Sequence, residues 1–196
     1  MLSRFKKYLF IILSSTYFAV GCGIFDTRDA EKPNAVRSTF VPPTSPELVI
    51  TNLEFSILEK NSDNYFKCLS RDNFNYIPDS RSQLIYGHIF KEWNVLSEKR
   101  YLDNILLQTD VTSTSRIFFD NKRFTQISPD SALFQSDYIL VFQHRRNDIP
   151  KSSKGSLNIY INSDEDRLFH IVRWEDYRYN DTDFTWSQTR AVFWQN

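Results

Sequence analysis

The sequence predicts a single α+β domain over residues 45–196, in which N-terminal helices pack on one face of a curved antiparallel β-sheet meander. Apolar residues recur at helical spacing up to about residue 105, beyond which the period changes from 3.6 to 2. Short polar turns separate the later segments, which indicates antiparallel neighbours. Helices followed by a run of antiparallel strands are typical of an α+β domain with its helices on one sheet face.

Three helical segments are expected before the sheet. The first begins after Ser45, which can cap it, with Pro46 at the first helical position and Glu47 near the positive helix end. The second is short, and the third continues loosely to Leu102. Their apolar stripes are Val49, Ile50, Leu53 and Ile57 in the first, Tyr65, Phe66 and Leu69 in the second, and Ile89, Phe90, Trp93 and Leu96 in the third.

Six segments rich in β-branched and aromatic residues follow, separated by clusters of turn-forming residues. One predicted turn is Asp120-Asn121-Lys122. We expect strands over residues 112–120, 123–127, 137–146, 156–162, 168–176 and 184–194.

The N-terminus carries the signature of export. Basic Arg4, Lys6 and Lys7 precede a 13-residue apolar stretch over residues 8–20, too short for a membrane span of about 20 residues. The segment Ala19-Val20-Gly21-Cys22 resembles the lipobox of bacterial lipoproteins, with Ala19 where that family prefers Leu. The resemblance implies that residues 1–21 are a cleaved signal peptide and that Cys22 is acylated; the alternative is an ordinary cleaved signal.

An acylated Cys22 implies anchoring in a membrane. Several acyl chains on one residue hold durably, whereas a single chain holds weakly. Residues 22–44 contain Pro33, Pro42 and Pro43 and few apolar residues, which predicts a tether. Gly23 stands where retention in the inner membrane favours Asp. By resemblance to other lipoproteins we therefore expect the outer membrane, with the domain in the periplasm or at the cell surface.

Composition excludes several classes of function. Without residues 1–21 the chain has 21 basic and 24 acidic residues, a net charge of −3, which disfavours a nucleic-acid partner. The four glycines are too scattered for a phosphate-binding loop, so no nucleotide cofactor is expected.

Cysteine usage argues against a disulfide and against a thiolate metal site. If Cys22 is acylated, Cys68 has no partner, and we expect it to be a buried, inert thiol. Two cysteines cannot form a CxxC-type metal site. The acidic turns at residues 164–166 and 181–183 do not space their oxygens as a calcium loop does, so no metal is expected.

The order of elements over residues 45–196 resembles the NTF2-like (SnoaL-like) cone. The resemblance rests on Leu53, Ile57, Lys60-Asn61 and Tyr65 in the opening helices, on Phe74-Asn75-Tyr76, and on Trp93 before the long strands. These are patterns of spacing. The resemblance implies a pocket between sheet and helices, where the enzymes of that class place an Asp–His or Tyr–Asp pair and where other members only bind or pack.

Among the three histidines, His170 is the candidate acid or base. Strict alternation places it on one strand face with Val172, Trp174 and Asp176, so that it would line the pocket. The alternative is a hydrogen-bonded core histidine, which is the commoner situation. His88 and His144 are expected at the surface.

The predicted last strand carries a second candidate site. Alternation places Trp186, Arg190 and Trp194 on one face, and a partly exposed Trp/Arg strip is typical of binding surfaces. The alternative is that these side chains belong to the core.

The sequence thus favours a lipid-anchored, non-catalytic domain of the cell envelope that binds a small apolar ligand or an envelope protein. One alternative is a SnoaL-like small-molecule enzyme that uses His170 as acid or base. Another is a structural subunit of an envelope complex.

Overall fold

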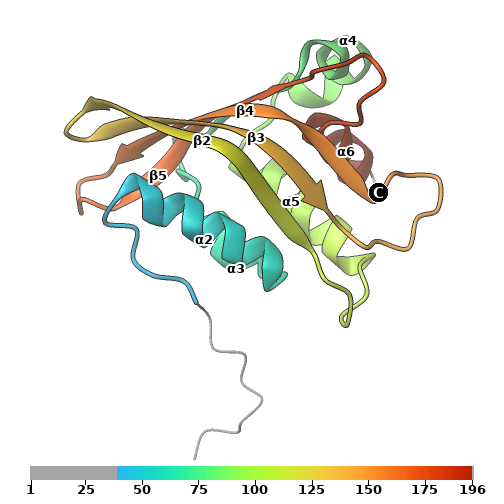
Figure 1. Cartoon of the computed structure of the whole chain (residues 1–196), viewed down its shortest axis with the longest axis horizontal. Coiled ribbons are helices and arrows are strands. Elements are labelled where there is room, and N and C mark those ends of the chain that lie inside the picture. Colours follow the sequence, from blue (N-terminus) through green and yellow to red (C-terminus); the bar gives the residue numbers. More distant parts are fainter. Residues whose placement is uncertain (1–38, 196) are drawn as a thin grey trace, which may run out of the picture. The chain divides into compact units, whose positions relative to one another are not determined.

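The computed structural model describes residues 39–195, in which helices cover one face of a curved five-stranded sheet (Figure 1). The strand order is β1-β5-β4-β3-β2. The predicted α+β class is therefore confirmed. The elements in chain order are α2 (Pro46–Leu58), α3 (Ser62–Lys67), β1 (Asn75–Ile77), α4 (Ser80–Phe90), α5 (Val95–Leu107), β2 (Arg116–Ser128), β3 (Ser131–Val141), β4 (Ser152–Ser163), β5 (Phe169–Tyr177) and α6 (Trp186–Trp194).

The first two helices begin as their capping residues predict. The Ser45 hydroxyl accepts the Leu48 N–H, with proline in the first turn of α2. The Asn61 side chain caps α3 in the same way. The third predicted helix is in fact two, because the Asn94 side chain accepts the N–H groups of Leu96 and Ser97 and starts α5 there.

Strands β2 to β5 form the predicted antiparallel meander. The expected strands at 112–120 and 123–127 are one strand, β2, because the predicted turn around Asn121 is an irregularity within the ladder, with Asn121 at a φ of 54°. The three-residue β1 pairs parallel to β5 and was not expected as a strand.

The expected last strand at 184–194 is wrong, because these residues form helix α6. A capping box starts the helix: the Thr185 hydroxyl accepts the Gln188 N–H, and the Gln188 side chain accepts the Thr185 N–H. Figure 1 shows α6 beside α5 and near the start of β4, where Ser153 is hydrogen-bonded to Thr189 at 2.7 Å.

Residues 39–44, expected as the end of the tether, form a strap that packs on the domain. The Asn52 side chain on α2 donates to the Val41 carbonyl at 2.7 Å and accepts its N–H at 3.0 Å. The Phe169 N–H donates to the Pro43 carbonyl at 2.7 Å. The strap therefore joins α2 to the start of β5.

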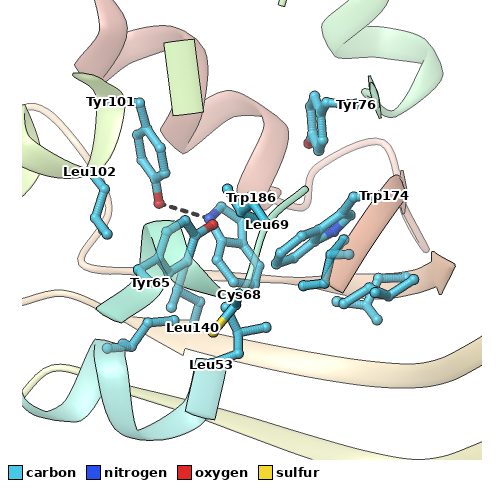
Figure 2. Packing of buried hydrophobic residues seen from close by; sticks show 14 of the residues in the cluster. Leu53, Tyr65, Cys68, Leu69, Tyr76, Tyr101, Leu102, Leu140, Trp174 and Trp186 are labelled. Carbon is cyan, nitrogen blue, oxygen red and sulfur yellow. Dashed lines mark hydrogen bonds between the residues drawn. The ribbon is translucent and has the colours of Figure 1, made fainter. Parts of the chain in front are cut away.

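The core lies between the sheet and the helices and combines aliphatic side chains with large aromatic ones (Figure 2). Cys68 lies within it at 1% exposure, as predicted, and burial raises the pKa of its thiol. Among residues 39–195, no helix is long and apolar enough to cross a bilayer. The expected signal peptide, lipobox and Cys22 lie outside the described residues.

Candidate functional site

A fully buried ion pair occupies the interior between sheet and helices. Arg190 on α6 and Glu98 on α5 are both 0% exposed. The Arg190 Nε lies 2.8 and 2.9 Å from the two Glu98 carboxylate oxygens, and its Nη2 lies 2.7 Å from Oε1. The Tyr65 hydroxyl and the Trp93 indole N–H donate to the same carboxylate at 2.6 and 2.8 Å. Desolvation of this pair is thus offset by a complete set of donors.

Aromatic rings surround the Arg190 guanidinium. Its central carbon lies 4.2 Å from the ring centroid of Tyr76, 4.5 Å from that of Trp174 and 4.6 Å from that of Trp186. These are distances at which a cation is attracted to the face of a π-system. The Trp186 indole N–H donates to the Tyr101 hydroxyl at 2.7 Å, which fixes one ring of this cage (Figure 2).

A second buried acid, Asp176 at the end of β5, extends the network. It accepts the Tyr138 hydroxyl at 2.7 Å and the Ser187 N–H at 2.7 Å. The Tyr76 hydroxyl lies 2.6 Å from the Ser187 hydroxyl and 3.3 Å from Arg190 Nη1, so it links the two networks. Burial raises the pKa of Asp176, and this outweighs the hydrogen bonds and the Arg190 charge that lower it.

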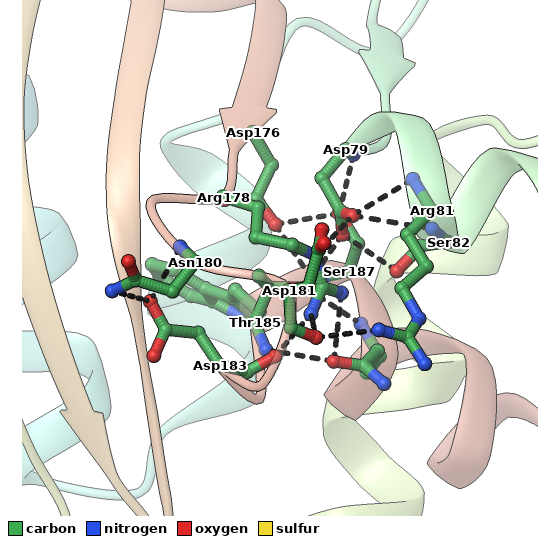
Figure 3. A network of polar contacts seen from close by, with 12 residues as sticks. Asp79, Arg81, Ser82, Asp176, Arg178, Asn180, Asp181, Asp183, Thr185 and Ser187 are labelled. Atoms are coloured by element: carbon green, nitrogen blue, oxygen red, sulfur yellow. Dashed lines mark hydrogen bonds and ion pairs between the residues drawn. The ribbon is translucent and has the colours of Figure 1, made fainter.

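Asp79 connects this interior to the surface (Figure 3). Its carboxylate caps α4 through the Ser82 N–H, and it also accepts the Thr185 hydroxyl at 2.6 Å and the Arg178 Nε at 3.0 Å. Thr185 is itself the N-cap of α6. One buried carboxylate therefore holds the starts of two helices together, and the Ser187 hydroxyl accepts the Asp79 N–H at 3.0 Å.

This filled interior overturns the expectation of a Trp/Arg binding surface. Trp186 and Arg190 are both 0% exposed, because α6 is inserted between α5 and the sheet instead of forming a strand. Trp194 is half-buried, with the Arg100 guanidinium 5.1 Å from its ring centroid. The three side chains form part of the core and its margin.

His170 lies on the opposite face of β5 from the one expected. The ladder between β4 and β5 pairs Tyr160 with Arg173 but Ile161 with Ile171, so Val172 is an extra residue in a bulge. Ile171 and Trp174 consequently both point inward at 0% exposure. Without the bulge, strict alternation would have placed His170, and not Ile171, on the inner face with Trp174.

Both ring nitrogens of His170 contact acceptor oxygens. Nε2 lies 3.0 Å from the Asp164 carboxylate in the β4–β5 turn, and Nδ1 lies 3.2 Å from the Lys67 carbonyl at the end of α3. A hydrogen bond from the Leu168 backbone N–H lowers the pKa of Asp164, and the hydrogen bond to His170 lowers it to a smaller extent. The ring thus ties the turn to α3 and has no unengaged nitrogen for proton exchange with a ligand.

A surface groove of about 530 Å³ lies around this histidine. One wall is the strap, the second is the end of α3 with the loop after it, and the third is the β4–β5 turn. The volume is within the range of small-molecule sites, roughly 300–1,000 Å³. The lining side chains used below are Phe40, Lys67, Arg71, Asp72, Asp166 and His170.

The other two histidines are explained by local structure. His88 is exposed on α4, whereas His144, expected at the surface, is buried at 3% exposure. His144 Nε2 faces the Pro150 carbonyl at 3.2 Å and Nδ1 faces the Lys151 ammonium at 3.2 Å. Burial and the nearby Lys151 and Arg146 charges lower the pKa of His144. Within the described chain no group of three or more potential metal ligands comes together.

Sequence reasoning did not single out Arg71, Asp72 or Asp166 as site residues. They come from segments almost a hundred residues apart and belong to no motif. Only the folded chain brings these three side chains to one groove, because Leu69, just after α3, forms a β-bridge with Ile171 of β5.

The sequence matches no protein-family profile and no curated protein, whereas many solved structures share its fold. A proposed scytalone dehydratase from Novosphingobium aromaticivorans has a TM-score of 0.54 at 9% identity over 70% of this chain and 84% of that one. An NTF2-like protein from Cytophaga hutchinsonii has a TM-score of 0.50 at 7% identity over 67% and 93%.

A third structure is a proposed calcium/calmodulin-dependent protein kinase II association domain from Xanthomonas campestris. Its TM-score is 0.52 at 8% identity over 69% of this chain and 86% of that one. At such identities the likeness concerns the fold alone, which is that of an α+β NTF2-like cone, as the sequence predicted.

Proposed function

We propose that this chain is a lipid-anchored protein of the cell envelope whose NTF2-like domain binds a ligand or a partner protein without catalysing a reaction. The observation that supports this most is the filled interior. Arg190, its aromatic cage and Glu98 fill the space between the sheet and the helices, where the NTF2-like resemblance implies a pocket. Binding then takes place on the outside of the cone, and the groove around His170 is the site that the domain offers for a small ligand or an envelope protein.

The anchoring part of the proposal rests on the lipobox at Cys22. The strap of residues 39–44 is bonded to α2 and to β5, so the part of the tether between Cys22 and the domain is the 16 residues from 23 to 38. Fully extended, these residues reach roughly 55 Å. The domain would thus work close to the membrane, in the periplasm or at the cell surface.

A SnoaL-like enzyme with His170 as acid or base is the alternative that one observation favours, namely the 3.0 Å contact of His170 with Asp164 beside a groove. It is the weaker candidate because the second ring nitrogen is engaged by the Lys67 carbonyl. A structural subunit of an envelope complex would instead co-purify with fixed partners from membranes.

Replacement of Cys22 by Ser tests the anchor. We expect the Cys22→Ser protein to lose its acyl groups and to be released or mislocalised, which fractionation and mass spectrometry of the intact chain would measure. A Cys22→Ser form that stays in the membrane fraction, uncleaved and free of lipid, would show that the apolar stretch over residues 8–20 anchors the chain instead. Co-purified lipids and proteins in the wild-type sample would identify what the domain binds.

A further inference from the structure

The groove around His170 carries charges of both signs. Lys67 and Arg71 come from the end of α3 and the loop that follows it, and Asp166 comes from the β4–β5 turn. Asp72 lies next to Arg71. The α3 wall thus presents two cations with one carboxylate beside them, and the wall formed by the β4–β5 turn presents a further carboxylate. A groove with both signs of charge is complementary to a ligand that itself bears both charges.

Some of these charges are already used inside the protein, and others are not. The Lys67 ammonium lies 3.3 Å from the Asn64 side-chain oxygen and 5.3 Å from the Phe40 ring centroid. Within residues 39–195, by contrast, the side chains of Arg71, Asp72 and Asp166 make no hydrogen bond or ion pair. A free guanidinium and two free carboxylates therefore face one groove, whose walls are joined by His170.

Arg71 also borders a second, apolar hollow. This neighbour has about 570 Å³ and is lined by Phe66, Asn94, Val95 and Leu96 besides Arg71. Leu96 is 67% exposed, which is high for a leucine. The guanidinium thus stands between a polar groove and an apolar one, an arrangement suited to the anionic group of an amphiphile.

We propose that the groove binds a zwitterion with a phosphate and a primary ammonium, the chemistry of phosphoethanolamine. The Arg71 guanidinium, aided by Lys67, receives the phosphate, and the Asp166 and Asp72 carboxylates accept from the ammonium. This ligand comes either free or as the head of a phospholipid, whose apolar part would lie along Leu96. The inference deepens the proposed function, since it assumes that the domain is a binding module close to a membrane.

The test is calorimetric titration of the chain from residue 22 onwards, with the full tether and Cys22→Ser to prevent acylation. The probes are O-phosphoethanolamine, O-phosphocholine, ethanolamine and inorganic phosphate. We expect O-phosphoethanolamine to bind best, because O-phosphocholine has no N–H to donate. Arg71→Ala should weaken binding at least about tenfold, the effect of a lost charge-assisted hydrogen bond. Asp166→Asn should weaken binding of O-phosphoethanolamine but not that of inorganic phosphate.

The matched control is Arg123→Ala, which removes another exposed arginine on β2. Both arginine variants should unfold at the wild-type temperature. Equal affinity of Arg71→Ala and Arg123→Ala, or inorganic phosphate binding as well as O-phosphoethanolamine in the wild type, would overturn the proposal. Neither result affects the outcome of the Cys22→Ser fractionation. The hypothesis of a zwitterion site in the groove can therefore be refuted separately from the hypothesis of a lipid anchor at Cys22.

Vesicles separate the two sources of the ligand. The same unacylated chain is sedimented with phosphatidylcholine vesicles that contain or lack phosphatidylethanolamine. Recovery that depends on phosphatidylethanolamine and on Arg71 assigns the site to a lipid head. Binding of the soluble probe without a vesicle preference assigns it to a free zwitterion, and absence of both refutes the site.

Discussion

The buried pair of Arg190 and Glu98 gives the sharpest prediction about this fold. Arg190→Met keeps an unbranched apolar stem as far as the position of Nε but leaves the Glu98 carboxylate at 0% exposure without its cation. Removing one partner of a buried ion pair costs about 3–5 kcal/mol. For a domain of this size, each kcal/mol lowers the melting temperature by roughly 2–4 °C, so we expect a decrease on the order of 10 °C.

A double-mutant cycle separates the loss of the pair from the loss of packing. Glu98→Gln removes the charge but keeps an oxygen that can accept from Tyr65 and Trp93. The double variant Arg190→Met/Glu98→Gln contains no unpaired charge and should be more stable than Arg190→Met by about 2 kcal/mol or more. Urea unfolding followed by tryptophan fluorescence measures both values, because Trp174 and Trp186 lie in contact with Arg190.

A pair whose cation is exposed supplies the control. Arg173 contacts Glu175 on the outer face of the sheet, with 47% of the arginine side chain but only 9% of the glutamate side chain exposed. Since Asn158 and Tyr177 still donate to Glu175 in its absence, Arg173→Met should cost at most about 1 kcal/mol. If Arg190→Met also costs less than about 1 kcal/mol, water or another group reaches Glu98, and the reasoning that the interior is closed is refuted.

Two further predictions concern polar groups outside the cage. Asp79→Asn should destabilise by about 2–3 kcal/mol, since the carboxylate caps α4 and binds Thr185 and Arg178. Burial raises the pKa of Asp79, but hydrogen bonds from Ser82, Thr185 and Arg178 outweigh it and hold the pKa below its usual value. The ionised carboxylate therefore stabilises the folded wild type above about pH 4, and this stability is lost as the pH falls further. Asp79→Asn, which has no proton to bind, should not show this loss. His144, whose pKa is lowered by burial and by Lys151, binds a proton less readily than in the unfolded chain. Wild type should therefore lose stability between about pH 7 and 5, and urea midpoints of His144→Gln should fall less over that range.

The parts of the fold that local chemistry determines could be predicted from sequence. Ser45 followed by Pro46 and Glu47 identified the start of α2, because capping depends on neighbouring residues. The meander of β2 to β5 followed from alternation and short polar turns. The bulge at Val172 could not be predicted, because strict alternation contains no signal for one extra residue. That single residue moved His170 from the expected pocket to the outer groove.

The error at α6 has a different cause. Strand propensity was read from Trp186, Val192, Phe193 and Trp194, but tertiary packing overrides such weak preferences. The one local signal for a helix was Thr185 three residues before Gln188, the spacing of a capping box. The groove carried no signal at all, since its charges meet only through the contact of the α3 end with β5.

The burial of Arg190 also explains why periodicity fails in α6. Polar Ser187, Thr189 and Arg190 are buried as fully as apolar Ala191 and Phe193, so the helix has no single apolar stripe to detect. Hydrophobic patterning therefore does little to determine how such a helix is rotated about its own axis in the core. Rotation by one residue, 100° about its axis, would turn the guanidinium away from Glu98 and leave that buried carboxylate without its cation. The ion pair therefore selects one orientation of α6, and with that orientation the aromatic rings of Tyr76, Trp174 and Trp186 close around the guanidinium and fill the interior.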